Sequence, residues 1–245
     1  RFTFVGAMGV LAAFIIMGYY PVVGGWSVAY IFKSIMGQLS TDQAAMGEAF
    51  TTLITGIASP IFWTAVYLLA NIVIVAKGIS AGIEKASKIM MPLLFILLII
   101  LVVRSLTLPG AMEGLKYLFV PDFSKLTGDV MLSALGQSFF SLSLGMGCMI
   151  TYASYLSKKD NLVENALIVP TMDTGVALLS GMVIIPATVA FGFDLGQGPG
   201  LVFVTVPAIF ATMGPVLGRF FGVVFFLLLT LAALTSSLSL LEVVV

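Results

Sequence analysis

The sequence predicts an all-α integral membrane protein, a multi-span helix bundle. Of its 245 residues, 60% are hydrophobic and 9% are charged, and the mean hydropathy is +1.17. Soluble globular domains carry about 25% charged residues, so this composition is typical of a membrane protein. The apolar stretches are long and continuous, as from Pro92 to Val103 and from Phe221 to Ala233, whereas the strands of a membrane β-barrel alternate apolar and polar residues.

The scarce residue types exclude several kinds of chemistry. The chain has no histidine and a single cysteine, Cys148, which is expected to be a small apolar filler. A disulfide framework, a Cys/His zinc site, a Cys-His dyad and a Ser-His-Asp triad therefore cannot form within it. Its 11 basic residues balance its 11 acidic ones without forming a basic stretch, so we expect no nucleic-acid partner.

Apolar runs of roughly 20 residues mark six expected spans of a single transmembrane domain over residues 1–245. Some runs exceed the bilayer thickness, which helix tilt can accommodate. In chain order, the spans cover residues 4–32, 60–76, 83–106, 129–156, 162–190 and 218–245.

The connections between these spans alternate in charge, which predicts their sides of the membrane. Two short basic connections are expected to be cytoplasmic, because positive charge favours that side; they hold Lys77, Glu84, Lys85 and Lys88, then Lys158, Lys159 and Asp160. The longer connections 37–58, 107–128 and 192–217 are expected to be outer loops; together with the start of the fourth span they hold Asp42, Glu48, Glu113, Lys116, Asp122, Lys125, Asp129 and Asp194. This topology predicts a multi-pass protein of the cell inner (plasma) membrane. It places Arg1 and the C-terminal end in the cytoplasm.

The outer connection 192–217 is rich in glycine and proline, yet it is too hydrophobic for a solvated linker. Two interpretations remain open: a lid that folds back against the bundle, or an interfacial loop.

The fourth span carries residues that weaken its own helix. Gly145 and Gly147 lower helix propensity by about 1 kcal/mol each, and Ser141 and Ser143 can compete for backbone hydrogen bonds. A break near 143–147 would expose backbone groups that can bind ions and small zwitterions. Glycines that allow close helix contact in an unbroken helix are the alternative.

Asp173 is the most informative polar residue at membrane depth. A carboxylate about a dozen residues into a span must be paired, protonated or bound to a cation, and no lysine or arginine lies at comparable depth. Thr171 and Thr174 offer further oxygens of the kind that hard cations prefer. If the span instead begins near residue 174, Asp173 is an interfacial cap.

The last span carries a stripe of small and hydroxyl residues at i, i+3, i+4 and i+7. Such a stripe is common at helix-packing seams, and it can also line a site. Its members are Ala232, Thr235, Ser236 and Ser239.

Four segments together resemble the neurotransmitter:sodium symporter family, in particular its bacterial amino-acid transporters. They are YYPVVGGW (19–26), GIEKASKIMMP (82–92), GQSFFSLSLGMGCMITYASY (136–155) and AALTSSLSLLE (232–242). The resemblance implies part of an inverted-repeat transporter core of five plus five helices, with these spans similar to the third to eighth. It therefore implies a fragment whose partners include the missing helices of the parent chain as well as the lipid bilayer.

The resemblance also implies two sets of site residues. Around an amino-acid substrate it places Ile16, Tyr20, Phe140, Ser141, Ser143, Met146, Ser236 and Leu240. For two sodium ions, with no organic cofactor, it implies Ser141 and Asp173 at the first and Ala232, Thr235 and Ser236 at the second. A homodimer is left open.

Asp173 departs from the family, which usually has asparagine at this position. Chloride-dependent relatives supply a negative charge through a bound ion, at positions that match Gln137, Ser141 and Ala177. We therefore expect chloride independence. The alternative is an Asp173 that is protonated at rest and exchanges its proton for sodium.

These observations predict a sodium-coupled symporter of a neutral, apolar or aromatic amino acid that works by alternating access, and not an enzyme. Proteases of the paired-aspartate kind need two acids, and the sequence offers one deep carboxylate. A non-transporting membrane substrate sensor or subunit that retains the fold is the main alternative, and a passive channel is another.

Overall fold

The computed structural model describes residues 3–78, 83–157, 161–192, 195–196 and 198–245. Its described residues are helical or in turns and loops, with no strand, which confirms the all-α class. The expectations for Arg1, Lys158, Lys159, Asp160 and Asp194 lie outside the described residues.

Long helices occupy five of the six expected spans. They are α1 (Thr3–Ile35), α3 (Ala58–Val75), α4 (Lys85–Leu106), α8 (Leu162–Ala190) and α10 (Pro215–Val244). Among the described residues, these five are long and apolar enough to cross a membrane. The remaining expected span, 129–156, is divided into α6 (Gly128–Ser141) and α7 (Cys148–Ser154), each too short to cross alone.

The connections expected as outer loops contain helices of their own. These are α2 (Gln43–Thr55), α5 (Ala111–Phe119) with the short 3-10 turn η2 (Phe123–Lys125), and the π-helical turn η3 (Leu201–Thr205), which runs into α9 (Val206–Thr212). Helix α2 begins where the Asp42 carboxylate accepts the amide of Ala44, and it buries Met46 and Leu53. Of the two interpretations of 192–217, the packing favours the fold-back, because Phe203, Ile209 and Phe210 are buried in it.

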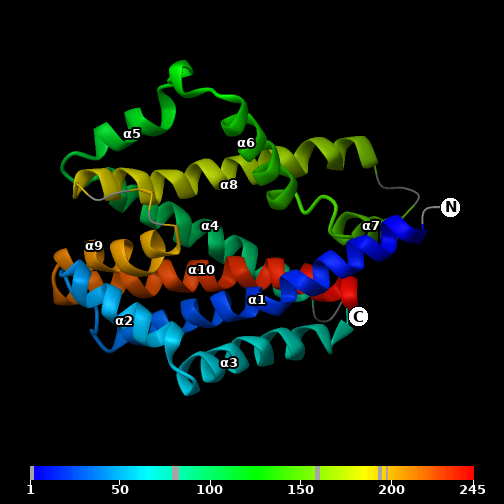
Figure 1. Ribbon diagram of the computed structural model, residues 1–245, viewed down its shortest axis with the longest axis horizontal. Coiled ribbons are helices and arrows are strands. Elements are labelled where there is room, and N and C mark those ends of the chain that lie inside the picture. Colours follow the sequence, from blue (N-terminus) through cyan, green and yellow to red (C-terminus); the bar gives the residue numbers. More distant parts are fainter. Residues whose placement is uncertain (1–2, 79–82, 158–160, 193–194, 197) are drawn as a thin grey trace.

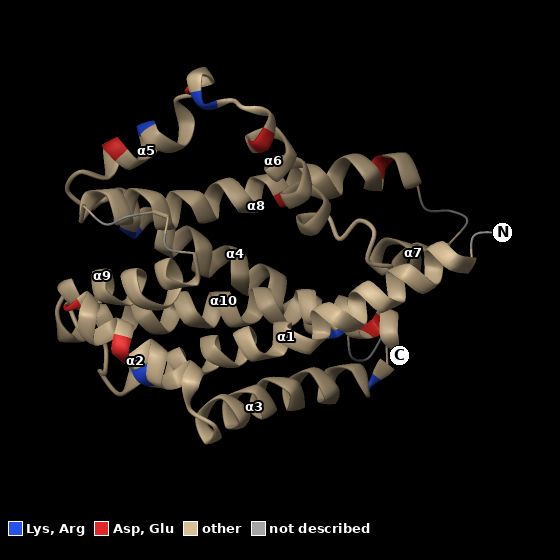
Figure 2. Cartoon of the chain, viewed as in Figure 1, with Lys and Arg blue, Asp and Glu red and all other residues tan. Residues whose placement is uncertain are grey.

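The two ends of the bundle differ in their connections (Figure 1). The described start of α1, the end of α3 and the end of α10 lie at one end, and α2 and α9 lie at the other. Figure 2 shows that charged residues cluster at the ends and connections of the long helices.

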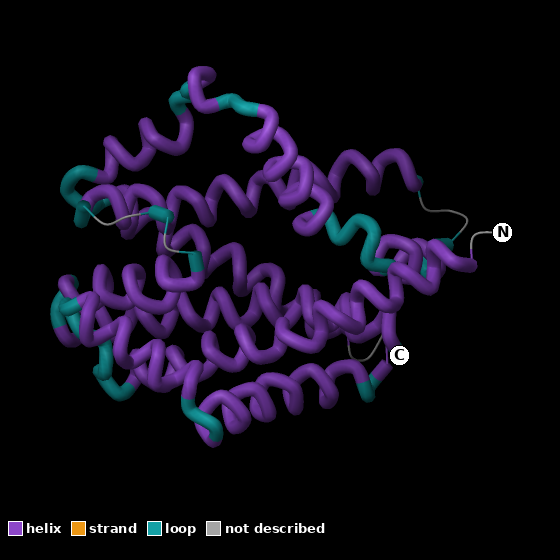
Figure 3. The backbone as a smooth tube through the Cα atoms, in the orientation of Figure 1, coloured by secondary structure: helices purple, strands orange, loops and turns teal. Residues whose placement is uncertain are grey.

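The largest hydrophobic core is built on α1, α4 and α10, with residues of α2, η3 and α9 packed onto one end of it (Figure 3). Helix α1 lies along α10 and against α3, where glycine permits backbone contact. A Cβ on Gly25 would lie 2.7 Å from the backbone nitrogen of Thr64. By contrast, α6 has no buried residue.

Candidate functional site

The helical backbone is interrupted between α6 and α7. Ser143, Gly145 and Gly147 all have positive φ, at 54°, 78° and 82°. Such values are favoured by glycine and are rare for serine, so they end the helix. The amide of Leu144 reaches back to the Phe139 carbonyl at 2.8 Å, and regular hydrogen bonding resumes when Thr151 donates to Gly147. The glycines are therefore not contact notches in an unbroken helix.

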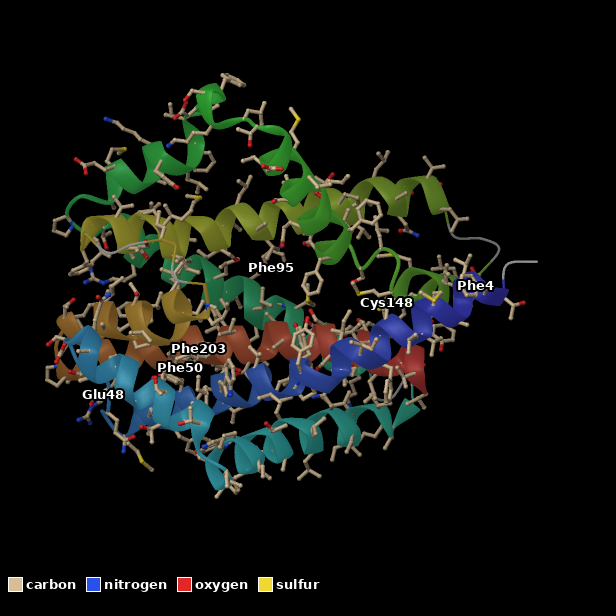
Figure 4. All side chains as sticks on the ribbon, in the orientation of Figure 1. Phe4, Glu48, Phe50, Phe95, Cys148 and Phe203 are labelled. Carbon is tan, nitrogen blue, oxygen red and sulfur yellow. The ribbon has the colours of Figure 1, made fainter. Side chains whose placement is uncertain are left out.

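Two neighbouring helices hold this break in place. A Cβ on Gly9 of α1 would lie 3.1 Å from the Gly147 nitrogen, and a Cβ on Gly147 would lie 2.7 Å from Cγ1 of Val243. On α10, Ser239 accepts a hydrogen bond from the Tyr152 hydroxyl at 2.8 Å. Cys148, labelled in Figure 4, is buried as expected for a filler, with its sulfur 3.7 Å from the Ser239 carbonyl. The break is thus fixed between α1 and α10.

A cavity of about 250 Å³ lies beside the break, and α1, α6, α8 and α10 all contribute to it. It brings together every residue that the sequence places around a substrate, although these residues are distant along the chain. Its lining is Ile16, Tyr20, Gln137, Phe140, Ser141, Ser143, Met146, Asp173, Ser236 and Leu240. Met146 and Leu240 are buried, whereas Phe140 is 47% exposed.

Asp173 is joined to the break by a hydrogen bond. The Ser141 hydroxyl donates to Oδ2 of Asp173 at 2.7 Å, so the two residues expected at the first sodium ion touch each other. Asp173 is not an interfacial cap, because α8 begins at Leu162 and its cap is Asn161, whose side chain accepts from Val163 and Glu164. Among the described residues, no lysine or arginine forms an ion pair with Asp173.

The expectation that the neighbouring threonines supply oxygens beside Asp173 is wrong. Neither Thr171 nor Thr174 lines the cavity, and the Thr171 hydroxyl donates to the Leu167 carbonyl of its own helix at 2.7 Å. The cause is helical geometry, since residues one or two positions apart point to different faces.

The residues expected at the second sodium ion lie on a single turn of α10. The Thr235 hydroxyl donates to the Ala232 carbonyl at 2.8 Å, while Ala232 and Ser236 line a second, larger cavity. The described residues hold no cluster of three His, Cys, Asp or Glu. The oxygens present are hydroxyls, carbonyls and one carboxylate, which suit a hard cation.

The larger cavity, of about 810 Å³, continues from the small one toward η3. The two cavities share Tyr20, Gln137 and Ser236 in their linings. Phe203 of η3 forms part of its outer wall and stacks on Phe50 of α2, with ring centroids 5.3 Å apart (Figure 4). Gln137 matches a chloride position in the family, and the fold places it at the junction of both cavities.

A bundle of apolar helices with one helix broken beside a polar cavity at mid-bundle defines a class of protein, the membrane transporters built on discontinuous helices. A profile of the Sodium:neurotransmitter symporter family matches residues 53–245. The chain belongs to this family, which consists of symporters and not of enzymes.

Relatives and a solved structure agree with this family. The chain is 45% identical to an uncharacterized sodium-dependent transporter of Haemophilus influenzae, over 98% of this chain and 53% of that protein. It is 43% identical to an uncharacterized sodium-dependent transporter of Bacillus subtilis, with the same two coverages. The crystal structure of MhsT in complex with L-phenylalanine superposes with a TM-score of 0.89 at 47% identity, covering 99% of this chain and 55% of MhsT. The chain thus spans about half the length of the relatives that it matches.

Proposed function

We propose that this chain forms the third to eighth helices of a longer sodium-coupled symporter, which takes up a neutral amino acid by alternating access. The observation that carries the proposal is the cavity beside the α6–α7 break, whose lining includes the residues expected around such a substrate. The described start of α1 and the end of α10 would face the cytoplasm, and the protein would lie in the plasma (inner) membrane.

The chemistry of the cavity supports a small zwitterion with an apolar side chain. Tyr20, Ser143 and Ser236 supply hydroxyls, and the break supplies backbone groups, for the charged end of the substrate. Ile16, Phe140, Met146 and Leu240 would surround its side chain. Methionine is flexible and polarizable, which suits large apolar or aromatic side chains. MhsT, which is 47% identical, was crystallised with L-phenylalanine.

Two sodium ions would drive the transport. Asp173 and Ser141 would bind the first ion beside the cavity, and the Ala232 carbonyl with Thr235 and Ser236 would bind the second. Moving one charge across the membrane is worth roughly 2.3 kcal/mol per 100 mV, so two ions supply several kcal/mol for accumulation. No covalent step is needed.

The charge of Asp173 supports chloride-independent transport. A fixed carboxylate at the first sodium ion would provide the negative charge that chloride provides in other family members. Asp173→Asn tests this interpretation: the variant should become chloride-dependent or inactive, and transport that stays chloride-independent would refute it. If Asp173 instead exchanges a proton for sodium, the unmodified protein should show proton counterflow that this variant loses.

The first experiment measures saturable binding of labelled leucine and tryptophan to the purified full-length parent protein, in sodium and then in potassium buffer. Binding that requires sodium supports a symporter, and the preferred ligand sizes the pocket. Equal binding in both buffers would contradict the sodium assignments of Asp173, Thr235 and Ser236. Sodium-dependent binding without coupled flux in vesicles would favour a substrate sensor or non-transporting subunit.

Two adjacent tyrosines of α1 provide a matched pair of variants. Tyr20 lines the cavity, whereas Tyr19 is 50% exposed. Tyr20→Phe should weaken amino-acid binding about tenfold, because a hydrogen bond to a charged group is lost. Tyr19→Phe removes the same atom away from the cavity and should leave affinity unchanged. Equal effects of the two variants would show that Tyr20 does not contact the substrate.

A further inference from the structure

A closed loop of hydrogen bonds lies behind the cavity, on the side of α3. Tyr67 and Asn71 of α3 and Ser237 of α10 are at most 1% exposed. The Tyr67 hydroxyl lies 2.9 Å from the Ser237 hydroxyl, Ser237 donates to Oδ1 of Asn71 at 2.5 Å, and Nδ2 of Asn71 donates to the Tyr67 carbonyl at 3.0 Å. Figure 3 shows α3 and α10 on the two sides of α1 in this part of the bundle.

Counting protons gives this loop a direction. Ser237 has one hydroxyl proton, and its shortest hydrogen bond is to Asn71. The Leu234 carbonyl, at 3.0 Å, is a second acceptor for the same proton. With its proton directed to either acceptor, Ser237 offers only its oxygen to Tyr67, so we assign Tyr67 as the donor. The amide orientation of Asn71 agrees, since its NH₂ group faces the Tyr67 carbonyl and its oxygen faces Ser237. Every member is satisfied, as burial in an apolar bundle requires.

The loop holds α10 against α3, and Tyr67 also contacts α1, so two of the helices that carry site residues meet it. Ser237 is next to Ser236, which lines both cavities. Adjacent residues of a helix point about 100° apart, so fixing Ser237 toward α3 fixes Ser236 toward the cavity. The Tyr67 ring also rests on α1: a Cβ on Gly24 would lie 2.4 Å from its Cζ atom. Gly24 is one turn after Tyr20 and lies on the same face of α1.

We propose that Tyr67 is a positioning residue, which through Ser237 sets the rotation of α10 that points Ser236 and Thr235 at the sodium and substrate sites. This inference rests on the proposed function. Tyr67 touches no ligand; it fixes the distance and rotation between α1 and α10 at the level of the cavity. Neither the apolar sequence around it nor the cavity lining assigns it a role.

The structure offers a matched control for its hydroxyl. Tyr30 of α1 is fully buried, as is Tyr67, but its hydroxyl has no hydrogen-bond partner among the described residues. Tyr30→Phe therefore removes the same atom from an equally buried tyrosine without breaking a bond. Tyr67→Phe removes the donor to Ser237, and Ser237→Ala interrupts the same loop from α10, also by removing a single hydroxyl.

The experiment uses the full-length parent protein and the labelled amino acid, leucine or tryptophan, that it binds more tightly. The readouts are the sodium concentration for half-maximal binding and the thermal midpoint. Tyr67→Phe and Ser237→Ala should each raise the half-maximal sodium concentration about tenfold. The double variant should do no more than the larger single effect, because both changes break one loop. Tyr30→Phe should leave this concentration within about twofold of that of the unmodified protein.

Two other outcomes overturn the proposal in distinguishable ways. If Tyr67→Phe and Ser237→Ala lower the thermal midpoint while the sodium midpoint stays unchanged, the loop is structural only. If the unmodified protein binds neither amino acid in a sodium-dependent way, the proposed function fails, and the positioning role fails with it. Should Tyr67→Phe not fold, Ser237→Ala alone decides between the first two results.

Discussion

Replacing Gly147 by alanine tests the break in the helix most directly. Gly147 has φ of 82°, and a Cβ there would lie 2.7 Å from Cγ1 of Val243. The left-handed conformation costs an alanine roughly 1–2 kcal/mol. Relieving the overlap with Val243 adds about 1–3 kcal/mol, as other overpacked sites do. Gly147→Ala should therefore destabilise the protein by about 2–5 kcal/mol.

Two further glycines calibrate this prediction. Gly145 also has positive φ, but no described atom lies within 4 Å of its added Cβ, so Gly145→Ala should cost only about 1–2 kcal/mol. Gly47 lies inside the outer helix α2 with open space around it, and Gly47→Ala should stabilise the protein by about 0.5–1 kcal/mol. The three variants thus differ in sign and size although the chemical change is the same.

The assay is unfolding of the purified full-length variants, followed by the loss of helical signal with heat or denaturant. The expected order of stability is Gly47→Ala, the unmodified protein, Gly145→Ala and then Gly147→Ala. In an unbroken helix with the same open space at 145, alanine would stabilise the protein, since alanine is the better helix former. A stabilised Gly145→Ala variant would therefore refute the break.

Three other measurements follow from the structure. Gly24→Ala should destabilise by several kcal/mol, because its Cβ would overlap the Tyr67 ring at 2.4 Å; an unfolding midpoint equal to that of the unmodified protein would contradict this packing. Replacing sodium by potassium should lower the thermal midpoint, since a ligand at 100 times its Kd stabilises the folded state by about 2.7 kcal/mol; identical midpoints would argue against bound sodium. At the turn η2, hydrogen bonds from Ser124 lower the pKa of the Asp122 carboxyl. The Ser124 amide should therefore stay protected from hydrogen exchange as pH falls through the ordinary Asp range, and lose this protection only below it. Amide exchange measured as a function of pH checks this; loss of protection already within the ordinary Asp range would contradict it.

Hydropathy predicts the long helices of this fold well and its short ones poorly. The expected span 162–190 coincides with α8, and 4–32 and 218–245 differ from α1 and α10 by a few residues. A window of about 20 residues cannot detect α2, α5 or α9, which are shorter. The signal for α2 was nevertheless present: Asp42 caps the helix, and the apolar residues Met46 and Leu53 share its buried face.

The site required more than physical reasoning on single segments. Such reasoning identifies Asp173, the weak helix at 141–147 and the stripe at 232–239, but it cannot join them, because a bundle can pack the same apolar faces in many ways. The resemblance to a family supplied the grouping of Tyr20 with Leu240. Closeness in sequence does not predict a shared site, since Thr171 and Thr174 do not line the cavity beside Asp173. The role of Tyr67 cannot be predicted from sequence, because a tyrosine in an apolar span does not indicate its hydrogen-bond partner.

The stripe on the last helix shows why its two interpretations could not be separated from sequence. Both are correct, for different residues of one helix face. Ser239 belongs to a packing seam, since it accepts from Tyr152 of α7. Ser236, less than one turn earlier, lines both cavities. The packing seam extends along α10 as far as α7 does. Beyond the start of α7 lies the helix break, and there the same face of α10 lines a cavity instead of contacting a helix. A polar stripe is therefore informative about a site only when the partner helix opposite it is known to be interrupted.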